Sequence, residues 1–544
     1  MSTAASRLEA RYPVSMAHLP ELVREALSGA VESPYAQVRL PEALEVMTRK
    51  GLLPAYIRDL VRVEEAVWDA FQSRASLSDE VTERTLNPSL HLVEVSWTGL
   101  AELLDKGMAE ESDPLPGQEA LLVFVHPGSL EVKVRAASHD DLLAMKITAE
   151  NLEVRDVAAE HDLPPVRLWN LLDRAAARGV LIAPTPKIAR DPQIFAGGPV
   201  RPERFQRPKV FTLQWHITQA CDLKCKHCYD RSSRSSLGLD QAMVILDQFE
   251  DFCSEQRVRG KITFTGGNPL LYPHFERVYQ EAAGRGFSLS ILGNPAPREA
   301  IERLAAIQTP GFYQVSLEGL PEHNNAIRQP GHFTRTLDFL QVLQDLKVPS
   351  QVMLTLTRDN MDQVLPLAER LRGLTDSFSF NRLSMVGEGA RLMLPERKEY
   401  EAFLREYRAA ARSNPILGIK DNLFNILRWE DGSRPFGGCT GFGCGAAFNF
   451  VALLPDGEVH ACRKFPSWIG NIFEASLHEI YESGHAKRYR AGSSACDGCS
   501  LRPVCGGCQA VVSSMGLDPA RDLDPHCFFP QDCEQVEAPE LCAG

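Results

Sequence analysis

The uneven distribution of cysteine constrains this chain more than any other feature. None of its 14 cysteines lies in residues 1–220, three fall in the segment 221–228, and ten lie between Cys439 and Cys542. Such clusters are metal or redox sites in a reducing compartment, whereas small secreted domains use them for disulfides. The N-terminus, MSTAASRLEARYP, contains no apolar segment typical of a secretory signal. We therefore expect a cytoplasmic protein whose clustered cysteines bind metal.

Composition and net charge further restrict the class of protein to which this chain can belong. Hydrophobic residues make up 44% and charged residues 24% of the 544 residues, which is typical of a globular chain with several domains. No apolar run approaches the roughly 18 residues that a membrane span needs, so we expect no membrane partner. The formal net charge of −13 argues against a nucleic-acid partner, because binding phosphates needs a basic surface.

Hydropathy patterns divide the chain into five parts. In the fourth part, residues 210–420, six strand candidates alternate with helical patterns. This alternation predicts an α/β fold, a partial (β/α)6 barrel of the TIM type with its chemistry at the carboxyl ends of the strands. The other parts are a helical N-terminal domain (1–113), a winged-helix-like hairpin with three helices (117–184), a linker rich in proline and glycine (185–209) and a cysteine-rich C-terminal domain (421–544).

The first cysteine cluster follows the first strand of the α/β part. The segment TQACDLKCKHCYD places Cys221, Cys225 and Cys228 in CxxxCxxC spacing. Three thiolates can bind three irons of a 4Fe–4S cube and leave the fourth iron open, whereas a structural zinc site would need a fourth protein ligand and none is near. In this motif the chain resembles the radical S-adenosylmethionine (SAM) superfamily, over roughly residues 210–420.

The resemblance implies a SAM site. In that family the open iron binds the amino and carboxylate groups of SAM, and electron transfer cleaves SAM to a 5′-deoxyadenosyl radical that abstracts a hydrogen atom. Carried over to this chain, Cys221, Cys225 and Cys228 are the ligands, and His227 and Tyr229 line the adenosyl site.

Other strand ends extend this resemblance. The second strand ends in TGGNP, where the family usually has Gly-Gly-Glu. Asn268 stands at the glutamate position, so the resemblance carries over the backbone contact with the SAM amino group rather than a side-chain contact. Structural roles are the alternative, and no catalytic acid or base can be assigned without geometry. The implied SAM-binding residues are Gly266, Gly267, Asn268, Pro269, Asn294, Ser316, Glu318 and Arg328, the last as a partner of the SAM carboxylate.

The C-terminal cysteine spacings resemble the SPASM domain of peptide-modifying radical SAM enzymes, except that two residues rather than three separate Cys505 from Cys508. The resemblance implies two auxiliary 4Fe–4S clusters with four protein ligands each, which favours electron transfer or a structural role over substrate ligation. A zinc ribbon or a single auxiliary cluster is the alternative. The first ligand set is Cys439, Cys444, Cys462 and Cys508, and the second is Cys496, Cys499, Cys505 and Cys527.

Three cysteines match no ligand position in these sets. Cys253 lies in a helical pattern, which predicts a buried core thiol. Cys533 and Cys542 lie in the tail, and the sequence assigns them no role.

The module at 117–184 is open to three interpretations. Its seven lysines and arginines against ten acidic residues give a charge of −3, which disfavours a DNA-binding winged helix. A purely structural domain is the second interpretation. The third is a peptide-recognition module that accepts a leader peptide as an added strand at the edge LEVKVR, residues 130–135. Residues 11–182 resemble partner proteins of peptide-modifying iron enzymes, through LLPAYIRDLVRVEEAVWDAF, NPSLHLVEVSW and LLVFVHPGSLEVKVRAASHDDLLAM.

Together these parts resemble a maturase of ribosomally made peptides, and the TGGNP variant with this front end is similar to the selenobiotic, or thio(seleno)oxazole, peptide maturases. The resemblance implies three 4Fe–4S clusters and SAM as cofactors, a precursor peptide and a reductant such as flavodoxin or ferredoxin as partners, and a sulfur- or selenium-to-carbon cross-link as one product. A sulfatase-type side-chain oxidase or a non-peptide radical SAM dehydrogenase is the alternative. A regulator that uses clusters as sensors is disfavoured by the intact SAM-site motifs. The modified residue and the oligomeric state are not set by the sequence.

Overall fold

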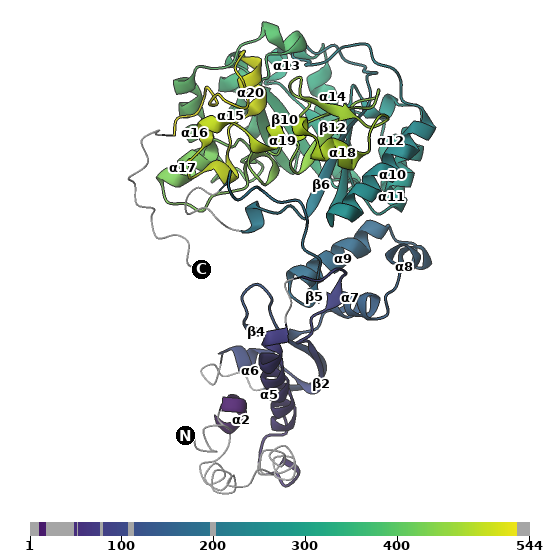
Figure 1. The fold of residues 1–544 in the computed structure, drawn as a ribbon, viewed down its shortest axis with the longest axis vertical. Helices are drawn as coiled ribbons and strands as arrows, with labels where there is room; N and C mark the ends of the chain where they lie inside the picture. The colour runs from purple at the N-terminus through teal and green to yellow at the C-terminus, as the bar shows by residue number, and fades with distance from the viewer. Residues whose placement is uncertain are drawn as a thin grey trace. The chain divides into compact units, whose positions relative to one another are not determined.

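The chain divides into two compact units, Met1–Thr185 and Pro186–Gly544 (Figure 1). The computed structural model describes residues 10–17, 48–51, 53–76, 80–106, 114–195 and 203–529. Within these ranges, no helix combines the length and the apolar character that crossing a membrane requires.

The first unit is built on a three-stranded antiparallel sheet in the order β2-β3-β4, with a short β1–β5 pair beside it. The hairpin and the three helices expected between residues 121 and 178 are present as β3, β4, α7, α8 and α9. The elements are α2 (Pro13–Ala17), α5 (Ile57–Gln72), η1 (Ser73–Ser76), β1 (Thr85–Leu86), β2 (His91–Thr98), α6 (Leu100–Lys106), β3 (Leu115–Val125), β4 (Val132–Ala136), α7 (His139–Ala149), α8 (Val154–Glu160), α9 (Pro165–Ala177) and β5 (Leu181–Ile182).

Strand β3 is covered on both faces because its side chains alternate between two cores. Leu121 and Val123 pack with the apolar face of α5, whereas Leu122 and Phe124 pack with α7, α8 and α9. Strand β2 lies within residues that the sequence predicts to be helical, and it pairs with β3 across the expected boundary at 113–117. The segment His91–Thr98 alternates in burial as a strand does, so it joins the sheet.

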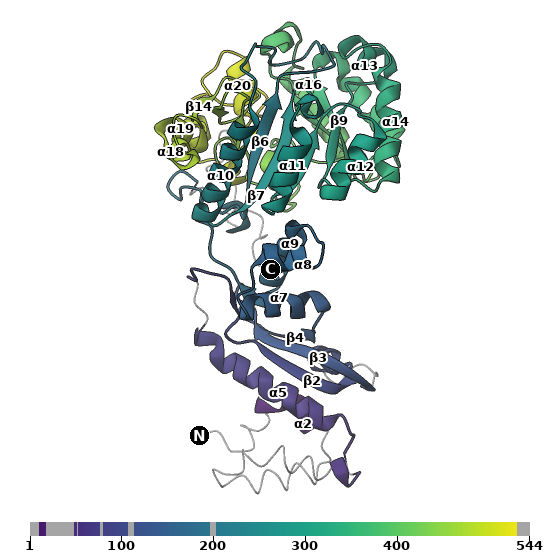
Figure 2. The same ribbon diagram turned by 90° about the vertical axis from the view of Figure 1, so that its right-hand side faces the viewer.

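The second unit contains a nine-stranded sheet in the order β11-β10-β9-β8-β7-β6-β12-β13-β14. Figure 2 shows strands β6, β7 and β9 of this sheet among the helices of the second unit. Strands β6 to β11 are parallel and follow one another in sequence order, with helices between them, which confirms the predicted α/β barrel-like fold. Among the described strands, β6 pairs on its other side with β12 rather than with β11, so the barrel is partial.

The first half of this unit contains the barrel elements. They are η3 (Glu203–Phe205), β6 (Val210–Thr218), α10 (Leu239–Gln256), β7 (Arg259–Gly266), η4 (Pro269–Leu271), α11 (Phe275–Gly284), β8 (Ser288–Leu292), α12 (Arg298–Ile307), β9 (Tyr313–Ser316), α13 (Pro321–Ile327), α14 (His332–Asp345), β10 (Ser350–Leu356), η5 (Arg358–Gln363), α15 (Val364–Leu371), β11 (Ser377–Arg382) and η6 (Gly387–Arg391).

The remainder contains two helices and then the cysteine-rich region. The elements are α16 (Arg397–Ala410), α17 (Phe424–Glu430), η7 (Gly438–Thr440), β12 (Phe450–Leu453), β13 (Glu458–His460), β14 (Trp468–Asn471), α18 (Leu477–Glu482), α19 (Gly484–Ala491), η8 (Ser494–Cys496), η9 (Arg502–Val504) and α20 (Gln509–Ser514).

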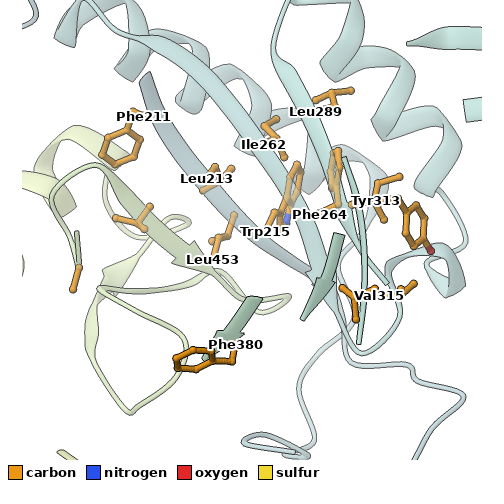
Figure 3. Close-up of a cluster of buried hydrophobic side chains, with 14 of the residues drawn as sticks. Phe211, Leu213, Trp215, Ile262, Phe264, Leu289, Tyr313, Val315, Phe380 and Leu453 are labelled. Carbon is orange, nitrogen blue, oxygen red and sulfur yellow. The ribbon is translucent and has the colours of Figure 1, made fainter. Parts of the chain in front are cut away.

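The core of the second unit lies on one face of the parallel strands (Figure 3). Phe211, Leu213 and Trp215 of β6 point into this core, together with Ile262 and Phe264 of β7. The alternate positions of β6 and β7 face the other side of the sheet, and most of them are polar, such as Gln214, His216 and Thr263. One face of the sheet therefore packs against the helices, and the other face carries polar side chains.

The described part of the predicted linker packs on the C-terminal region. Arg190 is buried, and its Nη2 donates to the carbonyl oxygens of Phe442 (2.7 Å) and Cys444 (2.8 Å). Its guanidinium also lies 3.8 Å from the ring centre of Phe448. Residues around Arg190 thus belong to the second unit rather than to a free connection.

Candidate functional site

The three-cysteine loop begins where β6 ends, and the two glycines of TGGNP hold it against β7. Gly266 has a φ of +138°, and a Cβ there would lie 2.2 Å from the carbonyl oxygen of Thr218. A Cβ on Gly267 would lie 2.2 Å from the carbonyl oxygen of Ala220. The amide of Gly267 donates to Thr218 O (2.8 Å), and that of Asn268 donates to Ala220 O (2.7 Å). Because glycine has no side chain, Gly266 and Gly267 allow the backbones of the strand and the loop to approach each other closely.

Two of the predicted asparagines bind the loop through a residue that the sequence reasoning missed. Asn294 Nδ2 donates to Asp222 Oδ1 (2.6 Å), and Asn268 Nδ2 donates to the same oxygen (3.1 Å). Asn294 Nδ2 also lies 3.7 Å from Cys221 Sγ. Both asparagines are buried, and Tyr313 OH donates to the Asn294 carbonyl (2.8 Å). The only sequence signal for this role of Asp222 is its position, because it is an acidic residue directly after the first cysteine.

A buried ion pair faces the other side of the loop. Arg328 donates to Glu318 Oε1 from Nε (3.0 Å) and Nη2 (2.5 Å), and its Nη1 lies 3.7 Å from Cys225 Sγ. Glu318 Oε2 accepts the amide of Thr355 (2.8 Å). Arg328, predicted as a partner of the SAM carboxylate, thus has Glu318 as its carboxylate partner in this structure.

His227 lies beside the ion pair of Arg328 and Glu318 and forms a group of three side chains with it. Its Nε2 lies 3.5 Å from Glu318 Oε1 and 3.5 Å from Arg328 Nη2. Burial lowers the pKa of His227 to about 4, although Glu318 acts in the opposite direction. Burial alone would raise the pKa of Glu318, but His227 and Arg328 lower it below its ordinary value. At neutral pH the group therefore contains a carboxylate, a guanidinium and a neutral imidazole.

The remaining predicted SAM contacts lie at neighbouring strand ends. Ser316 is the last residue of β9 and stands in register with Met353 of β10. Pro269 begins η4, which Asn268 caps by accepting the amide of Leu270 (3.4 Å).

The three loop thiols, which the resemblance predicts as cluster ligands, lie near one another after β6. Burial raises the pKa of Cys225, and Cys221 and Cys228 act on it as neighbouring thiols while Arg328 opposes them. All twelve cysteines of the described residues are free of disulfides. Within those residues, no three His, Cys, Asp or Glu side chains converge as for a single metal ion. A cube requires no such convergence, because each cysteine binds a different iron.

Four C-terminal thiols lie together near β12, β13 and α20. Burial raises the pKa of Cys462 to about 12, and the thiols of Cys444 and Cys508 contribute. Burial also raises the pKa of Cys439, with Cys508 again among its neighbours. The structure therefore brings together the four residues that the resemblance predicts as ligands of one auxiliary cluster.

The other four thiols form a second group. Burial raises the pKa of Cys496 to about 12, with contributions from Cys499 and Cys527. Burial raises the pKa of Cys505 as well, and Cys527, Cys496 and Cys499 add to the effect. These are the four thiols that the resemblance predicts as the second ligand set.

The cysteines outside the ligand sets divide into a buried thiol and the tail. Cys253 lies in α10 and is buried in the apolar core, as predicted, where a Cβ on Gly260 would lie 3.1 Å from its Sγ. Cys533 and Cys542 lie outside the described residues.

Comparisons with known protein families agree with this site. Residues 215–371 match the Radical SAM superfamily, and residues 444–509 match SPASM, an iron–sulfur cluster-binding domain. The chain is therefore a radical SAM enzyme. More particularly, it is a SAM-dependent iron–sulfur enzyme with a SPASM domain, which implies a SAM-binding 4Fe–4S cluster and further iron–sulfur clusters.

Similar proteins include a bacteriocin biosynthesis protein, a mycofactocin maturase and a heme synthase. The subtilosin biosynthesis protein AlbA of Bacillus subtilis is 26% identical over 55% of this chain and 67% of its own. The mycofactocin maturase MftC of Mycolicibacterium smegmatis is 27% identical over 60% of this chain and 85% of its own. An AdoMet-dependent heme synthase of Methanosarcina barkeri is 26% identical over 58% of this chain and 96% of its own.

The fold is also similar to solved structures. The crystal structure of Streptococcus suis SuiB covers 77% of this chain and 97% of its own, with 14% identity and a TM-score of 0.47. The structure of anSMEcpe with bound AdoMet covers 58% of this chain and 94% of its own, with 18% identity and a TM-score of 0.47.

Proposed function

We propose that this chain is a maturase that modifies a ribosomally synthesised precursor peptide by radical SAM chemistry. The observation that carries the proposal is the combination, in one chain, of a three-cysteine loop beside a polar sheet face, two further groups of four thiols, and a separate unit with an edge strand. AlbA and MftC, which are named for bacteriocin biosynthesis and for mycofactocin maturation, support it.

The chemistry belongs to the polar face of the parallel strands. When bound to Cys221, Cys225 and Cys228, a 4Fe–4S cluster with SAM would supply a 5′-deoxyadenosyl radical able to take a hydrogen atom from a peptide. Arg328 and Glu318 fix the side of the loop that carries Cys225, while Asn294 fixes the side of Cys221. Opposed anchors of this kind hold the loop in one geometry, which radical chemistry on a single C–H bond requires.

The two C-terminal thiol groups would hold two auxiliary 4Fe–4S clusters, giving three clusters in all. With four thiolates each, neither cluster has an iron open to substrate. We assign them to electron transfer or structure. A cytoplasmic reductant such as flavodoxin or ferredoxin would supply the electron for SAM cleavage, and the protein would act in the cytoplasm.

The first unit would bind the leader of the precursor at the outer edge of β4. The amide of His126 donates to Glu131 O (2.8 Å), and the amide of Ala137 donates to Ala120 O (2.8 Å). Inward and outward groups alternate along an antiparallel strand, so this pattern turns the amides and carbonyls of Val132 and Val134 away from β3. A peptide strand can add to those groups.

The side chains of β4 give this edge two different faces. Val132 and Val134 pack against the core shared with α5, whereas Arg135 pairs with the buried Asp141 through Nη1 (2.7 Å). Helix α6 also packs against β4. A leader strand added here would therefore place alternate side chains beside an apolar face and a basic one.

The likeness to AdoMet-dependent heme synthases favours a second candidate, a non-peptide substrate. The test is anaerobic incubation with SAM, a reductant and any small cysteine-containing peptide encoded beside the gene, followed by mass analysis. A sulfur-to-carbon cross-link would remove two hydrogens from the peptide. An unchanged peptide mass, with SAM cleaved only when a tetrapyrrole is added, would favour the second candidate.

A further inference from the structure

A charged residue of the C-terminal domain reaches into the three-cysteine loop. Asp230, two residues after Cys228, accepts a hydrogen bond on Oδ2 from Gln219 Nε2 (2.9 Å). The guanidinium of Arg463, the residue after Cys462, contacts the same oxygen. One carboxylate thus connects both ends of the three-cysteine loop to the residue beside a C-terminal thiol.

The contact is part of a larger bridge between the loop and the β12–β13 hairpin. Arg234 lies 3.5 Å from Asp230 Oδ2 through its Nε. Its Nη1 donates to Asp456 Oδ2 (2.6 Å) and to Glu458 Oε2 (2.8 Å). Because Arg234 holds the loop and the hairpin together by itself, Arg463 is not needed merely to join them.

The surroundings of Arg463 indicate an electrostatic role. The residue is 7% exposed, and its guanidinium carbon lies 5.1 Å from the ring centre of Tyr229. The guanidinium contacts the carboxylate of Asp230, and the backbone carbonyl oxygen of the same residue lies 3.2 Å from Cys228 Sγ, so the cation lies beside the three-cysteine loop. The Nε of Arg463 is buried without a hydrogen-bond partner among the described residues. A buried donor without a partner is costly, and its cost falls when an anionic group binds nearby.

We propose that the charge of Arg463, a residue of the C-terminal domain, raises the reduction potential of the cluster bound by Cys221, Cys225 and Cys228. Reduction adds one electron to a group already surrounded by thiolates. A buried guanidinium beside Cys228 stabilises that added negative charge, and Asp230 opposes it, because charges act strongly where water is excluded. The inference rests on the proposed ligand role of the three cysteines.

Removing the charge of Arg463 and removing that of Asp230 should shift the midpoint potential in opposite directions, which provides a test. In the full-length protein, reconstituted anaerobically, an EPR-monitored redox titration follows the signal that changes when SAM is added. Arg463→Gln should lower its midpoint potential, because a cation is lost and Asp230 loses a counter-charge. Asp230→Asn should raise it. Arg463→Lys, which keeps the charge, should stay near the parent value. Simple loosening of the loop would instead move the glutamine and asparagine variants in the same direction.

Iron content and the thermal unfolding temperature of each variant serve as folding controls. If Arg463→Gln does not fold, the comparison of Arg463→Lys with Asp230→Asn still tests whether these charges set the midpoint potential. An unchanged or lowered potential in Asp230→Asn overturns the inference. A potential in Arg463→Gln equal to that of the parent also overturns it. The triple alanine variant of Cys221, Cys225 and Cys228 tests the ligand assignment separately. If the signal that responds to SAM survives in that variant, the assignment itself is wrong.

Discussion

The edge of β4 allows a sharp test of leader binding, because one backbone donor can be removed without touching the hairpin. Val134→Pro deletes an amide that points away from β3, while the paired residues Lys133 and Arg135 keep their bonds to that strand. The carbonyl of Ala136 already accepts from Arg135 Nη1 (3.1 Å), so an added strand depends on the outward groups of Val132 and Val134.

The expected loss of leader affinity in Val134→Pro follows from the hydrogen bonds that the substitution removes. Proline removes one donor outright, and its ring displaces the neighbouring bond of the added strand. Two hydrogen bonds at about 0.5–1.5 kcal/mol each amount to about 1–3 kcal/mol, which weakens leader binding roughly 5- to 150-fold. We expect this loss in fluorescence anisotropy with a labelled leader. Peptide turnover should fall with it, while SAM cleavage without peptide stays at the parent rate.

Val134→Ala is the matched control, since it keeps the amide and shortens the side chain. It should bind the leader within a few-fold of the parent. Lys133→Pro removes an inward donor and should disrupt the β3–β4 pair itself, which a lower unfolding temperature of the first unit would reveal. Parent-like leader affinity in a folded Val134→Pro variant would refute strand addition at β4. Equal losses in the proline and alanine variants would point to side-chain recognition instead.

Three further predictions follow. Anaerobic reconstitution should load about twelve irons, from one three-thiol and two four-thiol sites, and a value near four with zinc present would refute the auxiliary clusters. Replacing Cys496 and Cys499 by alanine should spare SAM cleavage but stop peptide modification, and full modification would remove the second cluster from the reaction. Glu64 is 1% exposed, and burial raises its pKa to about 7 from 4.5, against hydrogen bonds from the amides of Val14 and Ser15. The first unit should therefore lose about 3 kcal/mol of stability as pH rises from 4.5 to 7. Glu64→Gln should remove this dependence in hydrogen exchange of α5 corrected for intrinsic rates, and an unchanged pH profile in that variant would contradict the assignment.

The parts of the molecule that the sequence could predict are those encoded locally. The CxxxCxxC loop and the alternation of six strands with helices depend on residues close together in the chain, and both appear in the structure. Strand β2 was missed because it lies between the helical segments α5 and α6, and its partner β3 follows a helix rather than a tight turn. Asp222 and Asp230 were missed because their partners, such as Asn294 and Arg463, come from distant segments that only the folded sheet brings near.

A second long-range contact explains why the C-terminal thiols and the barrel should act as one unit. Arg382, at the end of β11, is 1% exposed and donates to Asp421 (2.8 Å) and to both oxygens of Asp524 (2.8 and 2.7 Å). Asp524 Oδ2 also accepts the amide of Cys508 (2.8 Å). Removing one partner of such a buried network costs about 3–5 kcal/mol, since it leaves an uncompensated charge. A disturbance at Cys508 is therefore transmitted through Asp524 to the last barrel strand. Arg234 and Arg463 make the corresponding connection at the three-cysteine loop, so the barrel contacts the C-terminal region at two separate points.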